Sequence, residues 1–185
     1  MEKYISEKEK ASYGFAAVGS YMVAGITQSY LMYFFTDILI IPSAFVMMLM
    51  IVARVWDALN DPMMGVIVDR TSTKYGKMRP YVLVGSFLML VTTIVLFMPL
   101  TGAPTMFKMI FAAVSYIIFG MAYTLTDVPA MGLMSVATPN SDERASLLSF
   151  YVTVGSVGSL LPVGLLTIFQ SFIPEKYVYF AMSIF

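Results

Sequence analysis

Long apolar runs are the feature that most constrains the fold of this chain. About 20 consecutive apolar residues carry a helix across the hydrocarbon core of a bilayer. The sequence contains five runs of that length and the start of a sixth, at roughly residues 11–35, 43–68, 79–100, 105–137, 145–172 and 176–185. Hydrophobic residues make up 59% of the chain and charged residues only 12%, about half the charged share of a soluble domain. The sequence therefore predicts an all-α membrane protein.

Connecting segments that are rich in Lys and Arg alternate along the chain with segments that contain few of them. By the positive-inside rule, the segments rich in Lys and Arg stay in the cytoplasm. We therefore expect an integral protein of the plasma (cytoplasmic) membrane with its N-terminus in the cytoplasm. The dense side carries Lys3, Lys8, Lys10, Arg70, Lys74, Lys77, Arg79 and Arg144, and the other side carries Lys108 and Lys176.

The sixth run is short. Its ten residues make about 15 Å of helix, whereas the hydrocarbon core is about 30 Å thick. We therefore expect residues 1–185 to be the N-terminal, six-helix half of a twelve-helix membrane protein, ending within the sixth span, with the missing C-terminal half as its partner. Glycines in the first and fifth runs, such as Gly25 and Gly158, predict close packing between helices.

Four polar residues interrupt the second run: Arg54, Asp57, Asn60 and Asp61. Charges at bilayer depth cost several kcal/mol, so they are found there mainly when paired or functional. Positions 57 and 61 lie one helical turn apart on one face. Their oxygens, with that of Asn60, can coordinate Na⁺, or the two carboxylates can share a proton. The alternative is structural: Arg54 and Asp57 neutralise each other, and Asp61 caps a kink before Pro62.

A second polar group lies in the fourth run, where Thr124 and Asp127 share a helical face and Tyr123 lies beside them. Asp127 is the only charged side chain between Lys108 and the end of that run. An acid in such a position is expected to face a cavity or a polar partner. Its structural alternative is a pairing with Arg54 or with a helix-end amide.

Two charged segments at the membrane surface are expected to restrain one conformation of the protein rather than to contact a substrate. The first segment starts at Gly65, near the end of the second run, and continues into the loop that follows; the other precedes the fifth run as a surface ion-pair element. The residues assigned to this gating role are Arg54, Gly65, Asp69, Arg70, Lys77, Arg79, Glu143 and Arg144.

The composition also excludes several functions. The chain has no His and no Cys, so it lacks the commonest acid–base residue and any thiol nucleophile. Its formal net charge is zero, which does not suggest binding to nucleic acid. We therefore expect neither an enzyme nor a cofactor-binding protein, and the contacts that remain are a small molecule, a coupling ion and membrane lipid.

With these residues in view, the chain resembles the major facilitator superfamily and, within it, the glycoside–pentoside–hexuronide:cation symporters, the melibiose-permease group. The resemblance extends over nearly the whole chain. It is carried by Tyr13-Gly14 with LMYFFTD (Leu31–Asp37), RVWDALNDPMMG (Arg54–Gly65), DRTSTKYGKMRPYVL (Asp69–Leu83), and the region from Thr124 through Asp127-x-Pro129 to Asp142-Glu143-Arg144.

The resemblance implies symport by alternating access, with Na⁺ or H⁺ as the coupling ion. It implies that the cation site consists of Asp57, Asn60, Asp61 and Thr124, and that Asp127 and Tyr123 bind the sugar. Three positions depart from the melibiose-permease pattern: its first-span Asp aligns with Tyr21, its Trp with Met131, and its Arg with Tyr151 or Val152. A glycoside or oligosaccharide other than a galactoside is therefore the expected substrate.

Two other functions remain open. Apolar residues at Met131 and Val152 also suit a transporter of the same fold that carries a lysolipid or another amphipathic metabolite. A truncated membrane fragment that only packs against a partner is the second alternative.

Overall fold

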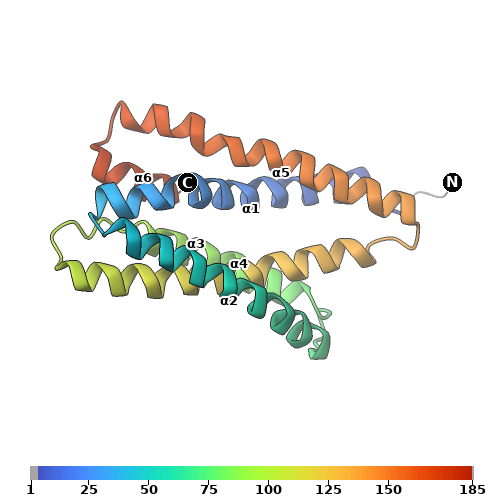
Figure 1. Ribbon diagram of the computed structural model, residues 1–185. Helices are drawn as coiled ribbons and strands as arrows, with labels where there is room; N and C mark the ends of the chain where they lie inside the picture. The colour runs from blue at the N-terminus through green and yellow to red at the C-terminus, as the bar shows by residue number, and fades with distance from the viewer. Residues whose placement is uncertain (1–3, 185) are drawn as a thin grey trace.

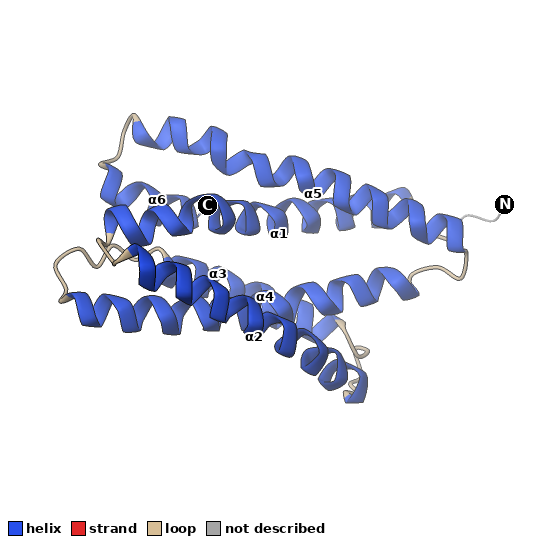
Figure 2. Ribbon diagram, in the orientation of Figure 1, coloured by secondary structure: helices blue, strands red, loops and turns tan. Residues whose placement is uncertain are grey.

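The structure, a computed structural model, describes residues 4–184. Six α-helices and one π-helical segment form the secondary structure of that part, which contains no strand (Figure 2). The predicted all-α fold is confirmed, while Lys3 and Phe185, used above for orientation and for the sixth span, lie outside the described residues. The elements are α1 (Glu7–Tyr33), η1 (Phe34–Ile38), α2 (Ser43–Arg70), α3 (Arg79–Leu96), α4 (Thr105–Val136), α5 (Ser141–Gln170) and α6 (Glu175–Ile184).

Two helices begin four residues earlier than their apolar runs, because a polar side chain caps each one. At the start of α1, Ser6 and Glu9 form a reciprocal capping box, which satisfies backbone N–H groups that have no partner within the helix. At the start of α5, the side chain of Asn140 accepts hydrogen bonds from the backbone N–H groups of Asp142 and Glu143. Capping therefore adds a charged first turn to both apolar helices.

The helices form two groups that lie side by side along the long axis of the molecule (Figure 1). One group contains α1, α5 and α6, and the other contains α2, α3 and α4; the most extensive contacts are those of α1 with α5 and of α3 with α4. The N-terminal end, the α2–α3 loop and the α4–α5 loop lie at the same end of the bundle (Figure 1). This arrangement places the segments that are rich in Lys and Arg at one end of the bundle, as expected if they lie on one side of the membrane.

Glycines allow α1 and α5 to approach to backbone contact. A Cβ atom at Gly25 would lie 2.5 Å from the carbonyl oxygen of Ser159, and one at Gly158 would lie 2.8 Å from that of Val18. Both distances are too short for any side chain larger than hydrogen. The two positions lie on facing surfaces of the pair, as the close-packing prediction for these helices requires.

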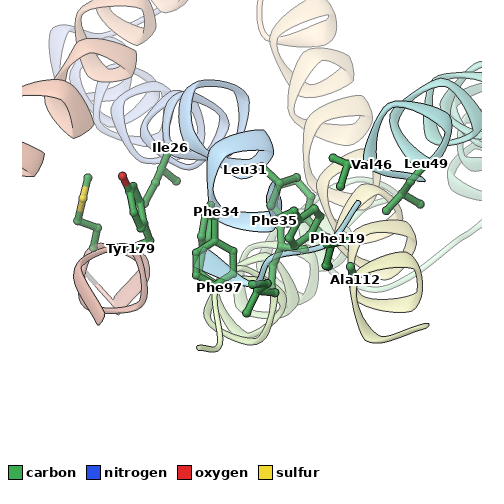
Figure 3. Packing of buried hydrophobic residues seen from close by; sticks show 14 of the residues in the cluster. Ile26, Leu31, Phe34, Phe35, Val46, Leu49, Phe97, Ala112, Phe119 and Tyr179 are labelled. Carbon is green, nitrogen blue, oxygen red and sulfur yellow. The ribbon is translucent and has the colours of Figure 1, made fainter. Parts of the chain in front are cut away.

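An aromatic cluster closes the end of the bundle opposite the charged loops (Figure 3). The rings of Phe34 and Phe97 are 5.3 Å apart and that of Tyr179 lies 6.0 Å from Phe34. Beside this cluster, buried Lys108 donates a hydrogen bond of 2.9 Å to the carbonyl oxygen of Leu39. The cluster therefore joins η1, α3 and α6, and Lys108 fastens the start of α4 to the end of η1.

Among the described residues, four helices are long and apolar enough to cross a membrane, namely α2, α3, α4 and α5. The 27-residue α1 is not one of them, because its sequence is richer in polar residues. Some of these, such as Ser20, Thr27 and Gln28, line internal cavities. The membrane nature of the protein is therefore evident in the structure, and the crossing of the bilayer by α1 stays a prediction.

Candidate functional site

The candidate site is built on a contact between α2 and α4. The hydroxyl group of Thr124 on α4 donates a hydrogen bond of 2.8 Å to a carboxylate oxygen of Asp61 on α2. Thr124 is buried, whereas Asp61 is exposed. A hydroxyl that donates to a carboxylate keeps its own lone pairs available to a cation. The bond therefore joins two of the predicted cation ligands across the helix interface.

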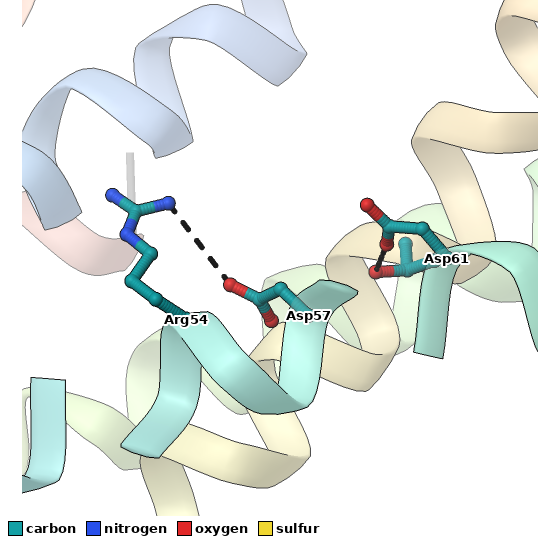
Figure 4. Close-up of polar contacts among 4 residues, drawn as sticks. Arg54, Asp57 and Asp61 are labelled. Atoms are coloured by element: carbon teal, nitrogen blue, oxygen red, sulfur yellow. Dashed lines mark hydrogen bonds and ion pairs between the residues drawn. The ribbon is translucent and has the colours of Figure 1, made fainter. Parts of the chain in front are cut away.

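Asp57 lies one turn before Asp61 on α2. It faces Gly120 of α4, a residue that has no side chain. A Cβ atom at Gly120 would be 3.2 Å from a carboxylate oxygen of Asp57, so glycine leaves room for the acid. A single ion pair, of 4.0 Å, joins Asp57 to Arg54, whose side chain is 74% exposed (Figure 4). A pair so long and so exposed holds little energy. The ion pair expected in the structural alternative is therefore present but long, and the choice between the two interpretations stays a prediction.

A cavity of about 200 Å³ connects these groups. Three helices line it, and most of its polar groups come from α2 and α4. The lining includes Thr27 and Gln28 of α1, Arg54, Asp57 and Asp61 of α2, and Tyr116, Tyr123, Thr124 and Asp127 of α4. Three acids therefore line one cavity together with a single arginine.

Asn60 is placed differently from the other predicted cation ligands. It is buried but does not line the cavity. In the part of the chain that the structure describes, its side-chain nitrogen has no hydrogen-bond partner, and neither does the indole nitrogen of Trp56 one turn earlier. The structure therefore brings Asp57, Asp61 and Thr124 to one cavity and leaves Asn60 outside it.

The predicted sugar-binding residues divide in a similar way. Tyr123 and Asp127 line the cavity, whereas Tyr21 does not. The ring of Tyr21 packs edge-to-face against that of Tyr151, with centroids 6.0 Å apart, and a Cβ atom at Gly155 would lie 2.7 Å from it. Tyr21 is still close enough to Asp127 for the two to interact electrostatically.

Tyr151 is a candidate that sequence reasoning identified only as a missing arginine. It is buried on α5 and interacts electrostatically with Asp127. Its ring packs against that of Tyr21. Phenol groups can donate hydrogen bonds to that acid or to a sugar hydroxyl. A tyrosine within an apolar run is no signal in itself, so only the packing of α1 on α5 reveals this residue.

The gating residues lie at the charged end of the bundle. The carboxylate of Glu143 accepts hydrogen bonds from the backbone N–H of Ile5, at 2.9 Å, and from the hydroxyl of Thr138, at 2.7 Å. Arg144 donates to the carbonyl oxygen of Ser135. Of these three contacts, two are made to backbone groups, and the surface ion-pair interpretation of this segment stays a prediction.

The other charged segment shows the same preference for backbone. Lys77 donates a hydrogen bond of 3.1 Å to the carbonyl oxygen of Asp69. The side chains of Asp69, Arg70 and Arg79 are exposed, and a Cβ atom at Gly65 would meet nothing within 4 Å. The α2–α3 loop is therefore held by its own hydrogen bonds.

The chemistry of the cavity suits a small ion better than a tightly bound metal. In residues 4–184, no group of three acidic side chains has the spacing of a metal site. Hard cations prefer oxygen ligands, and the cavity supplies carboxylate, hydroxyl and amide oxygens. The chain has no His and no Cys, so the site offers neither an imidazole nor a thiol.

Comparison with known proteins identifies the family. The model of a family described as MFS/sugar transport protein matches residues 12–185. The symporter YjmB of Bacillus subtilis is 37% identical over 161 residues, which are 86% of this chain and 35% of that protein. The inner membrane symporter YicJ of Escherichia coli is 34% identical over 85% of this chain and 34% of its own length.

The isoprimeverose transporter of Lactiplantibacillus pentosus is 30% identical over 83% of this chain and 32% of its own length. The chain thus spans about one third of the length of the curated relatives that it matches. The family match covers nearly the whole chain, and the all-α membrane fold agrees with it. The chain therefore belongs to the sugar transport proteins of the major facilitator superfamily, in the group of the glycoside–cation symporters, a family of transporters and not of enzymes.

Proposed function

We propose that this chain is the N-terminal half of a twelve-helix symporter that carries a glycoside or oligosaccharide together with Na⁺ or H⁺ by alternating access. The protein lies in the cytoplasmic membrane with its N-terminus in the cytoplasm. The observation that carries the proposal is the 2.8 Å hydrogen bond between Thr124 and Asp61, in a cavity that Asp57 and Asp127 also line. The names of the relatives, which are symporters and a transporter of isoprimeverose, support the same function.

Coupling follows from the charge of the cavity. Closing a cavity that holds uncompensated carboxylates removes them from water, which costs several kcal/mol per ion. A bound cation at Asp57 and Asp61 offsets this cost, so the closed state forms readily only when the ion is present. By linkage, the ion and the sugar raise each other's affinity by the same factor. The site lies between helices of one half and faces the other half of the transporter.

The sugar contacts are assigned to the other side of the same cavity. Asp127 and Tyr123 line it, and Tyr21 and Tyr151 pack against each other outside it. A carboxylate accepts hydrogen bonds from two sugar hydroxyls, and phenol groups add further donors. Because the acid of the melibiose-permease pattern is replaced here by Tyr21 and its arginine by Tyr151 or Val152, the proposed substrate is not a galactoside.

Uptake of labelled sugars by the full-length protein in vesicles tests the proposal. The cation requirement is measured for Asp57→Cys, Asp61→Cys and Thr124→Val, with Asp142→Asn as the matched control at an exposed helix start. Removing a hydrogen bond to a charged group costs about 1.5–3 kcal/mol, so Thr124→Val should raise the half-activating cation concentration at least about tenfold. Cation-stimulated uptake that is unchanged in both aspartate variants would refute the assignment.

The substrate class is tested with the same vesicles. A panel of glycosides and oligosaccharides should compete for uptake, and lysolipids should not. Inhibition by lysolipids alone would replace the sugar proposal with transport of an amphipathic metabolite. Absence of uptake for every solute, with the protein folded, would instead indicate a membrane protein that does not transport.

A further inference from the structure

A second concave site lies at the charged end of the bundle, apart from the transport cavity. It is a pocket of about 510 Å³ between the α2–α3 loop and the end of α4. The loop passes below the C-terminal part of α4 in this region (Figure 1). It shares no lining residue with the cavity described above. The lining residues are Tyr75, Gly76, Lys77, Met78, Arg79, Leu133 and Val136.

The loop that forms one wall of this pocket has a defined shape. Gly76 has a φ of +93°, in a region that favours glycine. The hydroxyl of Thr73 donates a 2.6 Å hydrogen bond to the carbonyl oxygen of Gly76, and Lys77 bonds the carbonyl oxygen of Asp69. Met78 packs against α4 at Gly132, where a Cβ atom would be 2.8 Å from the methionine sulfur. The wall is therefore fixed by internal bonds and fastened to α4.

The pocket combines positive charge with an apolar floor. Lys77 and Arg79 are exposed at its edge, and neither forms an ion pair with an acid within residues 4–184. Lys77 donates one of its three N–H groups to the backbone carbonyl oxygen of Asp69. On the floor, Leu133 and Met78 are half-buried, and the side chain of Val136 is 69% exposed.

The position of the pocket places it at the surface of the bilayer. The loop joins α2 to α3, and both helices are long and apolar enough to cross a membrane, as is α4 on the other side of the pocket. Basic residues at this depth attract anionic lipid headgroups by about 1 kcal/mol each. A free phosphate ion would contact only Lys77 and Arg79, whereas the acyl chain of a phospholipid would also cover the apolar floor.

We propose that this pocket binds one anionic phospholipid, with its phosphate group between Lys77 and Arg79 and the start of an acyl chain over Leu133 and Val136. The bound lipid would then connect the α2–α3 loop to the end of α4 through a molecule of the membrane. The proposal depends on the membrane location of the protein, and it does not depend on which solute or ion is transported.

Native mass spectrometry of the full-length protein, released from detergent with phosphatidylglycerol or phosphatidylcholine, tests the proposal. The wild type should retain phosphatidylglycerol in preference to phosphatidylcholine. At about 1 kcal/mol per cation, Lys77→Gln or Arg79→Gln should each weaken phosphatidylglycerol binding about fivefold. Val136→Glu, which leaves the loop intact and adds a negative charge to the floor, should have an effect at least as large.

Lys176→Gln is the matched control, because Lys176 is exposed at the opposite end of the bundle and makes a cation–π contact with Tyr177. It should leave phosphatidylglycerol binding unchanged. Equal losses in Lys176→Gln and Arg79→Gln would show a diffuse charge effect and overturn the proposal. So would full retention of lipid in Arg79→Gln and Val136→Glu, or displacement of the lipid by inorganic phosphate at equal concentration. Uptake measured in parallel keeps this result separate from the transport proposal.

Discussion

Replacement of Gly25 by alanine is expected to force α1 and α5 apart, a pair whose backbones lie in contact. The new Cβ atom would lie 2.5 Å from the carbonyl oxygen of Ser159 and 3.0 Å from its Cα atom. Both partners are backbone atoms, so no side-chain rotation can relieve the contact. The oxygen is about 0.9 Å closer than the 3.4 Å at which ordinary contacts begin.

The magnitude follows from two opposing effects. Inserting a methyl group into a filled interface typically costs about 1–3 kcal/mol in shifted backbone and strained side chains. Alanine is about 1 kcal/mol more favourable than glycine within a helix. Because the contact here involves backbone, we place the strain at the upper end, which leaves a net loss of about 1–2 kcal/mol in the free energy of unfolding.

Circular dichroism during denaturation of the purified full-length protein in detergent measures this loss. Gly19→Ala is the matched control, because it lies on the same helix and its Cβ atom would meet nothing within 4 Å. The control should be neutral or more stable than the wild type, by up to about 1 kcal/mol. The reasoning is refuted if Gly25→Ala proves as stable as Gly19→Ala.

Two further predictions concern the ends of the bundle. Lys108→Met keeps the length of the side chain and removes its hydrogen bond to Leu39, so it should lower the free energy of unfolding by about 1–3 kcal/mol in the same denaturation assay. At the other end, hydrogen bonds from the backbone N–H and the hydroxyl of Ser6 lower the pKa of Glu9, which precedes the membrane run. A lowered pKa in the folded state means that this stabilisation is present above the ordinary pKa of Glu and is lost as the pH falls through the lowered value. Ser6→Ala removes the hydroxyl donor, so NMR titration should show the pKa of Glu9 moving up towards its ordinary value; an unchanged pKa would contradict the capping box.

Apolar run length was sufficient to predict the fold class, because a bilayer admits few alternatives to a spanning helix. The helix starts were harder to predict. Hydropathy counts the charged residues Glu7 and Asp142 as loop, yet the caps at Ser6 and Asn140 make both helical. A hydrophobicity window cannot register a hydrogen bond between a side chain and the backbone.

The structure agrees with the sequence on the placement of those side chains whose position helical geometry alone decides. Positions 57 and 61 differ by about 40° around a helix of 3.6 residues per turn, and both acids line the cavity. Position 60 lies about 100° away from position 61, which turns Asn60 out of the cavity and into a buried position. The approach of Tyr151 to Asp127 depends on how α1, α4 and α5 dock, and no spacing within one helix contains that information.

The pairing of α1 with α5 has a consequence for biosynthesis. These two helices make the most extensive contact in the bundle, but α1 ends at Tyr33 and α5 begins at Ser141. At ribosomal speeds of about 5–20 residues per second, on the order of ten seconds separate the emergence of the two. During that interval the glycine surface of α1 must be sheltered by lipid or by the insertion machinery. The second group of helices, which is contiguous in the chain, can meanwhile assemble by itself.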